Sequence, residues 1–211
     1  MKNLLIIGAS GFGRDIYDLA QNSIGYGTEF QIKGFLDLDI HALDNYPIYP
    51  NVISSEDDYE IQPDDVFVCA LGNVRQKKKV YDKMIDRHAE FYTLIDKTAR
   101  VSPSAVIGKG CILGGQVLVG SAVVVGENTL IQKGAVIGHD AQVGKHCRID
   151  CMAMFVGGVV AKDEVTIHTS AVLNHKVVVE NGAVVGACSF VTRKVKENTT
   201  VFGIPARVLE Y

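Results

Sequence analysis

The sequence predicts two domains of different architecture: an α/β domain over residues 1–97 and a parallel β-helix over residues 98–211. Two observations predict this organisation. Strand-like and helix-like segments alternate before residue 97, and from residue 101 onward the chain advances in strict steps of six residues. A helix repeats about every 3.6 residues and a strand about every two, so neither produces a period of six, whereas a parallel β-helix does.

In the first domain, the expected elements are those of a parallel sheet with flanking helices. Strands are predicted over residues 3–7, 31–37, 66–72 and 91–96, and a helix over residues 74–88. The glycine-rich turn GASGFGRD, residues 8–15, leads into another amphipathic helix. The run QKKK at residues 76–79 lies within the second helix, where we expect a solvated face. This alternation is typical of a Rossmann-like βαβ domain.

The second domain contains 16 hexads between residues 101 and 196, without insertion or deletion. The first position is aliphatic in 14 hexads, with Phe155 and Ala161 as the exceptions, and the fifth is always Ala, Cys, Val, Thr or Ser. This pattern resembles the hexapeptide-repeat, left-handed β-helix family, in which three hexads form one coil of triangular section. The resemblance implies just over five coils, with the first residue of each hexad packed inward and the fifth where space is smallest.

Composition argues against several classes of function. A net charge of −3 provides no global positive field that would attract nucleic acid. No apolar run approaches the ~18 residues of a membrane span, and the apolar segment near the N-terminus is too short for a signal peptide. Five cysteines without a secretion signal predict reduced thiols and a cytoplasmic protein. No metal is expected, because Cys111 and Cys147 fall on the small fifth position and the cysteines lack zinc-site spacing.

The glycine-rich turn is a candidate phosphate site. Gly8, Gly11 and Gly13 follow a strand and open a helix, but their GxxGxG spacing is not the GxGxxG of dinucleotide-binding folds. A domain of this size holds one mononucleotide-binding half. Because Asp37 and Gly72 end two further strands at the same sheet edge, we expect a nucleoside diphosphate there, with its pyrophosphate on amides of the Ser10–Gly13 turn. The alternative is a tight strand–helix turn without a ligand.

His139 and Asp140 form the candidate catalytic pair. They lie between two aliphatic–glycine dipeptides, IG and VG, and His139 takes the third position of its hexad, which predicts an outward side chain near a corner. Histidine is largely unprotonated at neutral pH and can act as a general base, and a neighbouring carboxylate can fix its tautomer. The alternative is an exposed corner histidine. His146 is the next candidate for the base.

The motifs GASGFG, GFLDLD, ALGNVR, IGHD and VFGIPAR together resemble bacterial sugar acetyltransferases. These are typified by sialic-acid O-acetyltransferases and by N-acetyltransferases of UDP- or dTDP-linked amino sugars. The resemblance implies a homotrimer with acetyl-CoA, as co-substrate, in the groove between neighbouring β-helices. It also implies that His139 is the general base and that Asp140 raises its basicity.

The resemblance further implies two sets of binding residues. The nucleotide-sugar would contact Ser10, Gly11, Phe12, Gly13, Asp37, Leu38 and Gly72. The coenzyme groove would include Arg148, Gly157, His168 and Gly186. Two of these depart from the family pattern: Arg148 stands where many members have a second histidine, and His168 stands where a glycine is usual.

The expected function is therefore acetyl transfer from acetyl-CoA to the amino group of a nucleotide-linked amino sugar in bacterial surface-glycan biosynthesis. Transfer would be direct, in a ternary complex, with backbone amides of the Gly157–Gly158 turn as donors to the oxyanion. One alternative is O-acetylation of sialic acid or a related sugar. Another, of a different class, is a non-catalytic β-helix protein that binds a sugar nucleotide, and the departures at Arg148 and His168 keep this alternative open.

Overall fold

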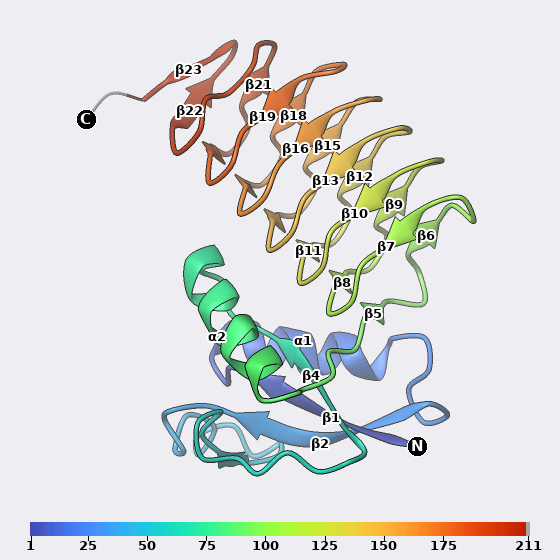
Figure 1. The fold of residues 1–211 in the computed structure, drawn as a ribbon, viewed down its shortest axis with the longest axis vertical. Coiled ribbons are helices and arrows are strands. Elements are labelled where there is room, and N and C mark those ends of the chain that lie inside the picture. Colours follow the sequence, from blue (N-terminus) through green and yellow to red (C-terminus); the bar gives the residue numbers. More distant parts are fainter. Residues whose placement is uncertain (210–211) are drawn as a thin grey trace. The chain divides into compact units, whose positions relative to one another are not determined.

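The structure, a computed structural model, describes residues 1–209. The chain divides into two compact units, of which the first comprises Met1–Lys97 and the second begins at Thr98. Each unit is described by itself. Figure 1 shows the helices and the four-stranded sheet in the first unit and the stacked coils in the second.

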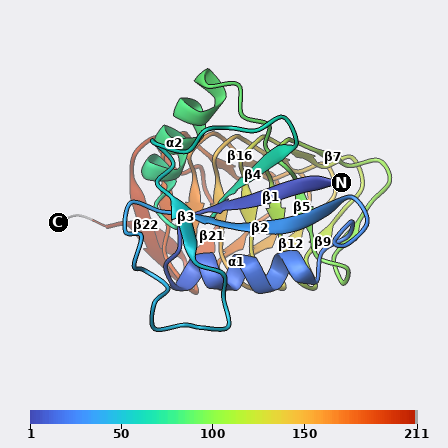
Figure 2. The same ribbon diagram turned by 90° about the horizontal axis from the view of Figure 1, so that it is seen from below.

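The first unit is a four-stranded parallel sheet of order β3-β2-β1-β4. Helices α1 and α2 pack on it, α1 against β1 and β2 and α2 against β4 (Figure 2). The elements are β1 (Lys2–Ile7), α1 (Gly11–Gln21), β2 (Phe30–Leu36), β3 (Val52–Ser54), β4 (Asp65–Cys69), α2 (Val74–Asp86) and β5 (Leu94–Ile95). The predicted Rossmann-like arrangement is confirmed. Strand β3 was not predicted, because three residues are too few to show a period.

Because the four strands are parallel, their carboxyl ends lie at one edge of the sheet. Two backbone hydrogen bonds tie these ends together: the Gly8 amide donates to the Leu36 carbonyl and the Ala70 amide to the Ile7 carbonyl, both at 2.8 Å. Gly13 has no room for a side chain, since a Cβ there would collide with the Gly8 carbonyl. The glycine thus allows α1 to start directly against β1.

One expectation about α2 is wrong. The basic run at residues 76–79 was predicted to form a solvated face, but Lys77 is only 2% exposed. The reason is helical geometry: Lys77 follows Val74 and precedes Val80 at intervals of three, so all three lie on the face that packs inward. Charge alone therefore did not decide which residue of the run faces water.

The second unit is a parallel β-helix with three sheets of stacked two-residue strands. From Arg100 to Val191, paired strands lie 18 residues apart, as in Val136↔Met154, so one coil takes three hexads, as predicted. At the C-terminal end, Val184 pairs with Thr200 and the last two strands are antiparallel. The six-stranded sheet contains β6 (Arg100–Val101), β9 (Leu118–Val119), β12 (Val136–Ile137), β15 (Met154–Phe155), β18 (Val172–Leu173) and β21 (Phe190–Val191). The five-stranded sheet contains β7 (Val106–Ile107), β10 (Val124–Val125), β13 (Gln142–Val143), β16 (Val160–Ala161) and β19 (Val178–Val179). The third sheet contains β8 (Ile112–Leu113), β11 (Leu130–Ile131), β14 (Arg148–Ile149), β17 (Thr166–Ile167), β20 (Val184–Val185), β22 (Thr200–Gly203) and β23 (Ala206–Val208).

The hexad positions have the predicted roles. First-position residues from Leu113 to Val191 are buried, including the non-aliphatic or small exceptions Phe155 and Ala161. Cys111 and Cys147, at the fifth position, are completely buried, so packing accounts for both. The fourth position adopts a positive φ in every hexad from Gly110 to Cys188, which turns the chain at each corner.

The outward face of the six-stranded sheet is apolar beyond Arg100 of its first strand. Its sixth-position residues form a ladder with one member per coil, and all of them are at least partly exposed. The ladder consists of Leu118, Val136, Met154, Val172 and Phe190.

A polar cluster stabilises the first unit. Asp65 is 3% exposed and accepts hydrogen bonds from Tyr59 Oη at 2.7 Å, from the Gln62 amide at 2.9 Å and from Lys33 Nζ at 2.9 Å. Burial by itself would raise the pKa of Asp65, but these hydrogen bonds and the lysine charge outweigh burial and hold its pKa below the ordinary value. The folded state therefore favours the carboxylate.

We expect Asp65→Asn to lower the free energy of unfolding at neutral pH by about 2 kcal/mol. This is less than the cost of breaking a fully buried ion pair, because Lys33, the partner of Asp65, reaches solvent. Because folding lowers the pKa of Asp65, its contribution is present above the pKa of the unfolded carboxyl, near 4, and is lost as the pH falls below it. Urea unfolding of both proteins between pH 3 and pH 7 measures this. A stability difference that stays constant over the range would contradict the assignment.

Candidate active site

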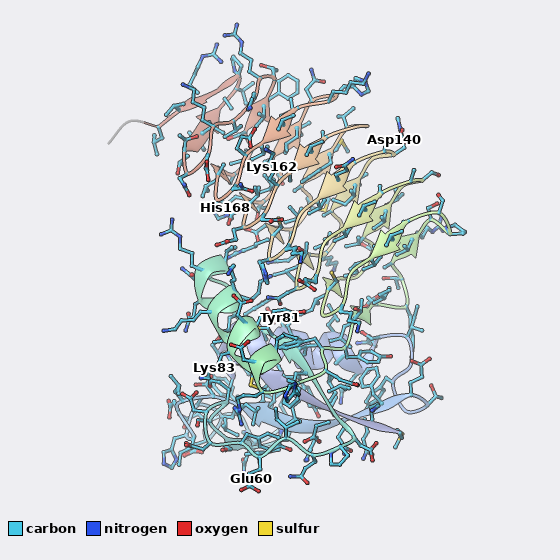
Figure 3. The ribbon with its side chains drawn as sticks, in the orientation of Figure 1. Glu60, Tyr81, Lys83, Asp140, Lys162 and His168 are labelled. Carbon is cyan, nitrogen blue, oxygen red and sulfur yellow. The ribbon has the colours of Figure 1, made fainter. Side chains whose placement is uncertain are left out.

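His139 and Asp140 occupy the corner between β12 and β13. Asp140 takes the fourth hexad position with a φ of 58°, a conformation that aspartate tolerates better than most residues. Its amide donates to the Ser121 carbonyl at 2.9 Å, which fixes the corner on the preceding coil. Both side chains point outward, with His139 65% and Asp140 67% exposed (Figure 3 labels Asp140 at the tip of its corner). The outward placement expected for His139 is therefore observed.

The two side chains form a dyad. Nδ1 of His139 lies 2.7 Å from Oδ2 of Asp140. A carboxylate can only accept, so Nδ1 carries the proton and Nε2 of the neutral ring keeps its lone pair. This is the tautomer that a general base acting through Nε2 needs.

Gly157, one coil above His139, faces the edge of the imidazole that would react. A Cβ on Gly157 would lie 2.5 Å from both Cε1 and Nε2 of His139, closer than any Cβ contact allows. Only glycine therefore lets the ring lie against the backbone of the next coil. Sequence reasoning assigned Gly157 to the coenzyme groove, and the geometry gives it a second role in positioning the ring.

The two amides proposed as oxyanion donors differ. The Gly158 amide donates to the His139 carbonyl at 2.8 Å, so it is already used within the fold. The Gly157 amide donates to no acceptor among residues 1–209. Of the pair, only Gly157 has an N–H that is not hydrogen-bonded within residues 1–209.

The other proposed coenzyme residues lie at a different corner, between the third sheet and the six-stranded sheet. Arg148 and His168 do not point freely into solvent, because both contact the buried carboxylate of Asp150. Gly186 follows in the same column, and a Cβ there would lie 2.5 Å from the Phe202 ring. Figure 3 shows Asp140 and His168 on opposite sides of the β-helix.

His146, the next candidate for the base, is only 5% exposed. Its Nδ1 lies 3.0 Å from Nδ2 of Asn128 on the preceding coil, and an amide nitrogen can only donate. His146 is thus buried and hydrogen-bonded within the β-helix, which leaves His139 as the accessible histidine of the two.

In the first unit, the N-terminus of α1 is open to an anion. Ser10 is the N-cap residue but makes no side-chain hydrogen bond, and the first turn, which contains Phe12, carries no acidic residue. At α2, by contrast, the Asn73 side chain accepts from the Gln76 amide at 3.0 Å and caps the helix. Gly11 would meet no close atom if it gained a Cβ, so this turn has space above it.

Asp37 joins the glycine turn to the loop after β2. Oδ2 of Asp37 accepts from the Ala9 amide at 2.7 Å, and Oδ1 accepts from the Asp39 amide at 3.0 Å. Leu38, between them, is 70% exposed. Gly72 lies at the adjacent strand end, just before the cap of α2. The predicted substrate residues are thus brought to one edge of the sheet.

Two further residues at this edge were not predicted. The guanidinium of Arg14 lies over the Tyr46 ring, 3.7 Å from its centroid, and Arg14 is the nearest side chain to Gly11. An arginine beside an uncapped helix N-terminus adds positive charge where phosphate would bind. The spacing from Gly11 to Arg14 was visible in the sequence, but Tyr46 lies in a loop whose contacts no local pattern predicts.

Within residues 1–209, no three His, Cys, Asp or Glu side chains are grouped so that they could hold a metal ion. None of the helices in that range is both long and apolar enough to cross a membrane. The site chemistry described above therefore consists of a histidine–carboxylate dyad, backbone amides and an arginine.

Comparison with protein families matches each unit. Residues 3–84 match the PglD N-terminal domain, and residues 83–185 match the GMPPB C-terminal domain. UDP-N-acetylbacillosamine N-acetyltransferase of Bacillus subtilis (strain 168) is 29% identical to the chain over 117 residues, which is 54% of this chain and 51% of that relative. The match thus spans about half the length of the relative.

Solved structures match over essentially the whole chain. The acetyltransferase domain of PglB from Neisseria gonorrhoeae FA1090, in complex with acetyl coenzyme A, has a TM-score of 0.88 at 24% identity and covers 99% of both chains. PerB from Caulobacter crescentus, in complex with CoA and GDP-perosamine, has a TM-score of 0.86 at 21% identity and covers 100% of this chain and 98% of its own. The predicted fold, an α/β domain followed by a left-handed β-helix, is confirmed, as is the resemblance to bacterial sugar acetyltransferases.

We expect Gly157→Ala to displace the His139 ring and to weaken its hydrogen bond to Asp140, because the new methyl group would overlap Cε1 and Nε2. The melting temperature should change little, since the dyad is exposed. Long-range ¹H–¹⁵N spectra of the imidazole report the tautomer and the hydrogen bond. Ser121→Ala, at the same hexad position one coil before His139, is the control, and an unchanged His139 spectrum in Gly157→Ala would refute the positioning role.

Proposed function

We propose that this chain is an acetyl-CoA-dependent N-acetyltransferase that acts on the amino group of a nucleotide-linked amino sugar in bacterial surface-glycan biosynthesis. The observation that carries the proposal is the His139–Asp140 dyad, with its Nε2 edge against Gly157. The named relative and the structural neighbours, which act on or bind UDP- or GDP-linked sugars and CoA, support the substrate class.

In the proposed reaction, Nε2 of His139 takes a proton from the sugar amine as its nitrogen attacks the thioester carbon. Asp140 holds Nδ1–H and stabilises the imidazolium that forms. The Gly157 amide would donate to the oxyanion of the tetrahedral intermediate. When the carbon–sulfur bond breaks, the imidazolium returns the proton to the thiolate, and the products are the acetamido sugar and CoA. The transfer is direct, so no acyl-enzyme forms.

The nucleotide-sugar is proposed to bind at the carboxyl edge of the four-stranded sheet. Its pyrophosphate would accept hydrogen bonds from amides of Ser10, Gly11, Phe12 and Gly13, at the uncapped N-terminus of α1. Arg14 would add a charged donor. Asp37, Leu38 and Gly72 would contact the nucleoside or sugar, and UDP or dTDP is the proposed nucleotide.

The proposed coenzyme contacts are Gly157 beside the base and, at the other edge of the six-stranded sheet, Arg148, His168 and Gly186. A homotrimer would bring such edges of neighbouring copies together. The exposed aliphatic ladder on that sheet supports assembly, because an apolar stripe of this length is costly to leave in water. We place the reaction in the cytoplasm, consistent with five cysteines that form no disulfide within residues 1–209.

The decisive experiment is release of CoA thiol from acetyl-CoA with a panel of UDP- and dTDP-linked 3-amino and 4-amino sugars, plus free sialic acid. We expect one amino sugar to turn over, and His139→Ala to lower kcat at least about 100-fold, the range for removal of a general base. His88→Asn, a histidine at a positive φ in the first unit, is the control.

The other outcomes of this assay are equally informative. Turnover of sialic acid alone would replace N-acetylation by O-acetylation. An unchanged kcat in His139→Ala would remove His139 as the base. Binding of a nucleotide-sugar without any turnover would favour a non-catalytic binding protein.

For the sugar site, we expect Asp37→Ala to raise the KM for the nucleotide-sugar about tenfold, because the variant loses both the carboxylate contact and the anchor of the Ala9 amide. The KM for acetyl-CoA should stay constant. Asp39→Ala, an exposed aspartate two residues further on, is the matched control. Equal effects of the two substitutions would contradict a specific role of Asp37.

A further inference from the structure

A second histidine–aspartate dyad lies at the corner between the third sheet and the six-stranded sheet. Nδ1 of His168 is 2.9 Å from Oδ2 of Asp150, one coil below. The Asp150 side chain is 6% exposed, whereas His168 is 39% exposed. Unlike the His139–Asp140 pair, this dyad thus has a buried carboxylate and a histidine that reaches solvent.

The carboxylate of Asp150 is held from three directions. Arg148 donates to both oxygens, from Nε to Oδ1 at 2.6 Å and from Nη2 to Oδ2 at 3.2 Å. Gln132, one coil below, donates to Oδ1 at 2.9 Å. With His168 this makes four hydrogen bonds on two oxygens, so the Asp150 carboxylate is held in one orientation.

This arrangement determines the chemistry of His168. Because Asp150 only accepts, Nδ1 must carry a proton, and the neutral ring presents the lone pair of Nε2. Nε2 makes no hydrogen bond within residues 1–209. The hydrogen bond to Asp150 thus fixes both the tautomer and the ring orientation of the partly exposed His168. The lone pair of Nε2 remains free to accept a hydrogen bond from a ligand.

The sequence places three polar residues in succession at this corner. Glycine is the commonest residue at the second hexad position, in seven of 16 hexads, and Gly114 and Gly186 occupy it at the two ends of this column. Between them stand Gln132, Asp150 and His168, one in each successive coil.

The surface beside the column is apolar and adaptable. Met152, at the corner itself, is 62% exposed, and Met154, at the start of the next strand, is 42% exposed. Methionine side chains adjust readily to the shape of a bound ligand. A ligand at this corner would therefore meet apolar surface together with one directed hydrogen-bond acceptor.

We propose that at this corner Nε2 of His168 accepts a hydrogen bond from an N–H or O–H group of a substrate, and that Asp150, held by Arg148, is the positioning residue that acts through His168. The proposal deepens the proposed function, since the donor would belong to one of its two substrates: an amide of the coenzyme arm, or a hydroxyl or amine of the sugar. The site gives Arg148 the role of orienting a histidine through a carboxylate.

Within one chain, His168 does not share a reacting atom with His139. The two corners lie at opposite edges of the six-stranded sheet, and a face of six residues spans up to about 20 Å. His168 therefore contributes binding in this chain rather than a second proton transfer at the same atom.

The test replaces His168 by Asn and by Gln, whose side-chain amides lie near the positions of Nδ1 and Nε2, respectively. In His168→Asn the side-chain amide can still donate to Asp150, but the outward acceptor is lost. In His168→Gln the amide oxygen can lie near the position of Nε2. Calorimetry with CoA and with the amino-sugar nucleotides of the panel measures binding without turnover, so its outcome is independent of whether the proposed acetyl transfer occurs.

We expect His168→Asn to weaken binding of one ligand about three- to tenfold, as for the loss of one hydrogen bond, with partial recovery in His168→Gln. Weaker CoA binding identifies the coenzyme as the donor, and weaker sugar-nucleotide binding identifies the sugar. Asp150→Asn should weaken binding of the same ligand. Combined with His168→Asn, it should cause no further loss of affinity, because both substitutions act through one contact.

Glu180→Gln is the matched control. Glu180 occupies the same hexad position at another corner, where Lys162 at 2.5 Å and Lys194 at 2.6 Å pair with its carboxylate. It should change stability without changing either affinity. If His168→Asn leaves both affinities unchanged and only lowers the melting temperature, the column is a structural ladder and the proposal is overturned.

Discussion

Each coil of the β-helix repeats the backbone of the coil before it at an interval of 18 residues, and this register determines which side chains can meet. Parallel pairing stacks residue i on residue i+18, so hydrogen bonds and packing form columns along the axis. Inward columns are filled by aliphatic and small residues, which leaves only the corners and outward faces for chemistry. Both histidine dyads lie at such corners.

The register also explains why single glycines matter at the candidate active site. The His139 ring can lie against the next coil only because position 157 has no side chain. The same stacking leaves the Gly157 amide without an acceptor among residues 1–209, since the residue above supplies no hydrogen-bonding group to it. One glycine thereby sets both the orientation of the base and the availability of a nearby donor.

In the α/β unit, side chains are brought together by a different constraint: the carboxyl ends of the parallel strands lie at one edge of the sheet. The ends of β1, β2 and β4 are tied by backbone hydrogen bonds, and the Asp37 carboxylate joins two of the loops that follow them. An uncapped helix N-terminus is tolerable there because its amides face an edge where a ligand can satisfy them. The two units thus present different groups, an uncapped helix N-terminus in one and a histidine–carboxylate dyad in the other.

The sequence by itself determined the coil length, the inward positions and the corner location of His139, because a strict hexad allows only one backbone path. It also determined the order of β1, α1 and β2, from local periodicity. Only the tertiary structure decided that Arg148 turns onto Asp150 and that Lys77 packs inward. Those outcomes depend on side-chain rotamers and on partners in other coils or strands. A local pattern gives the position of a side chain along the backbone but not the direction in which it points.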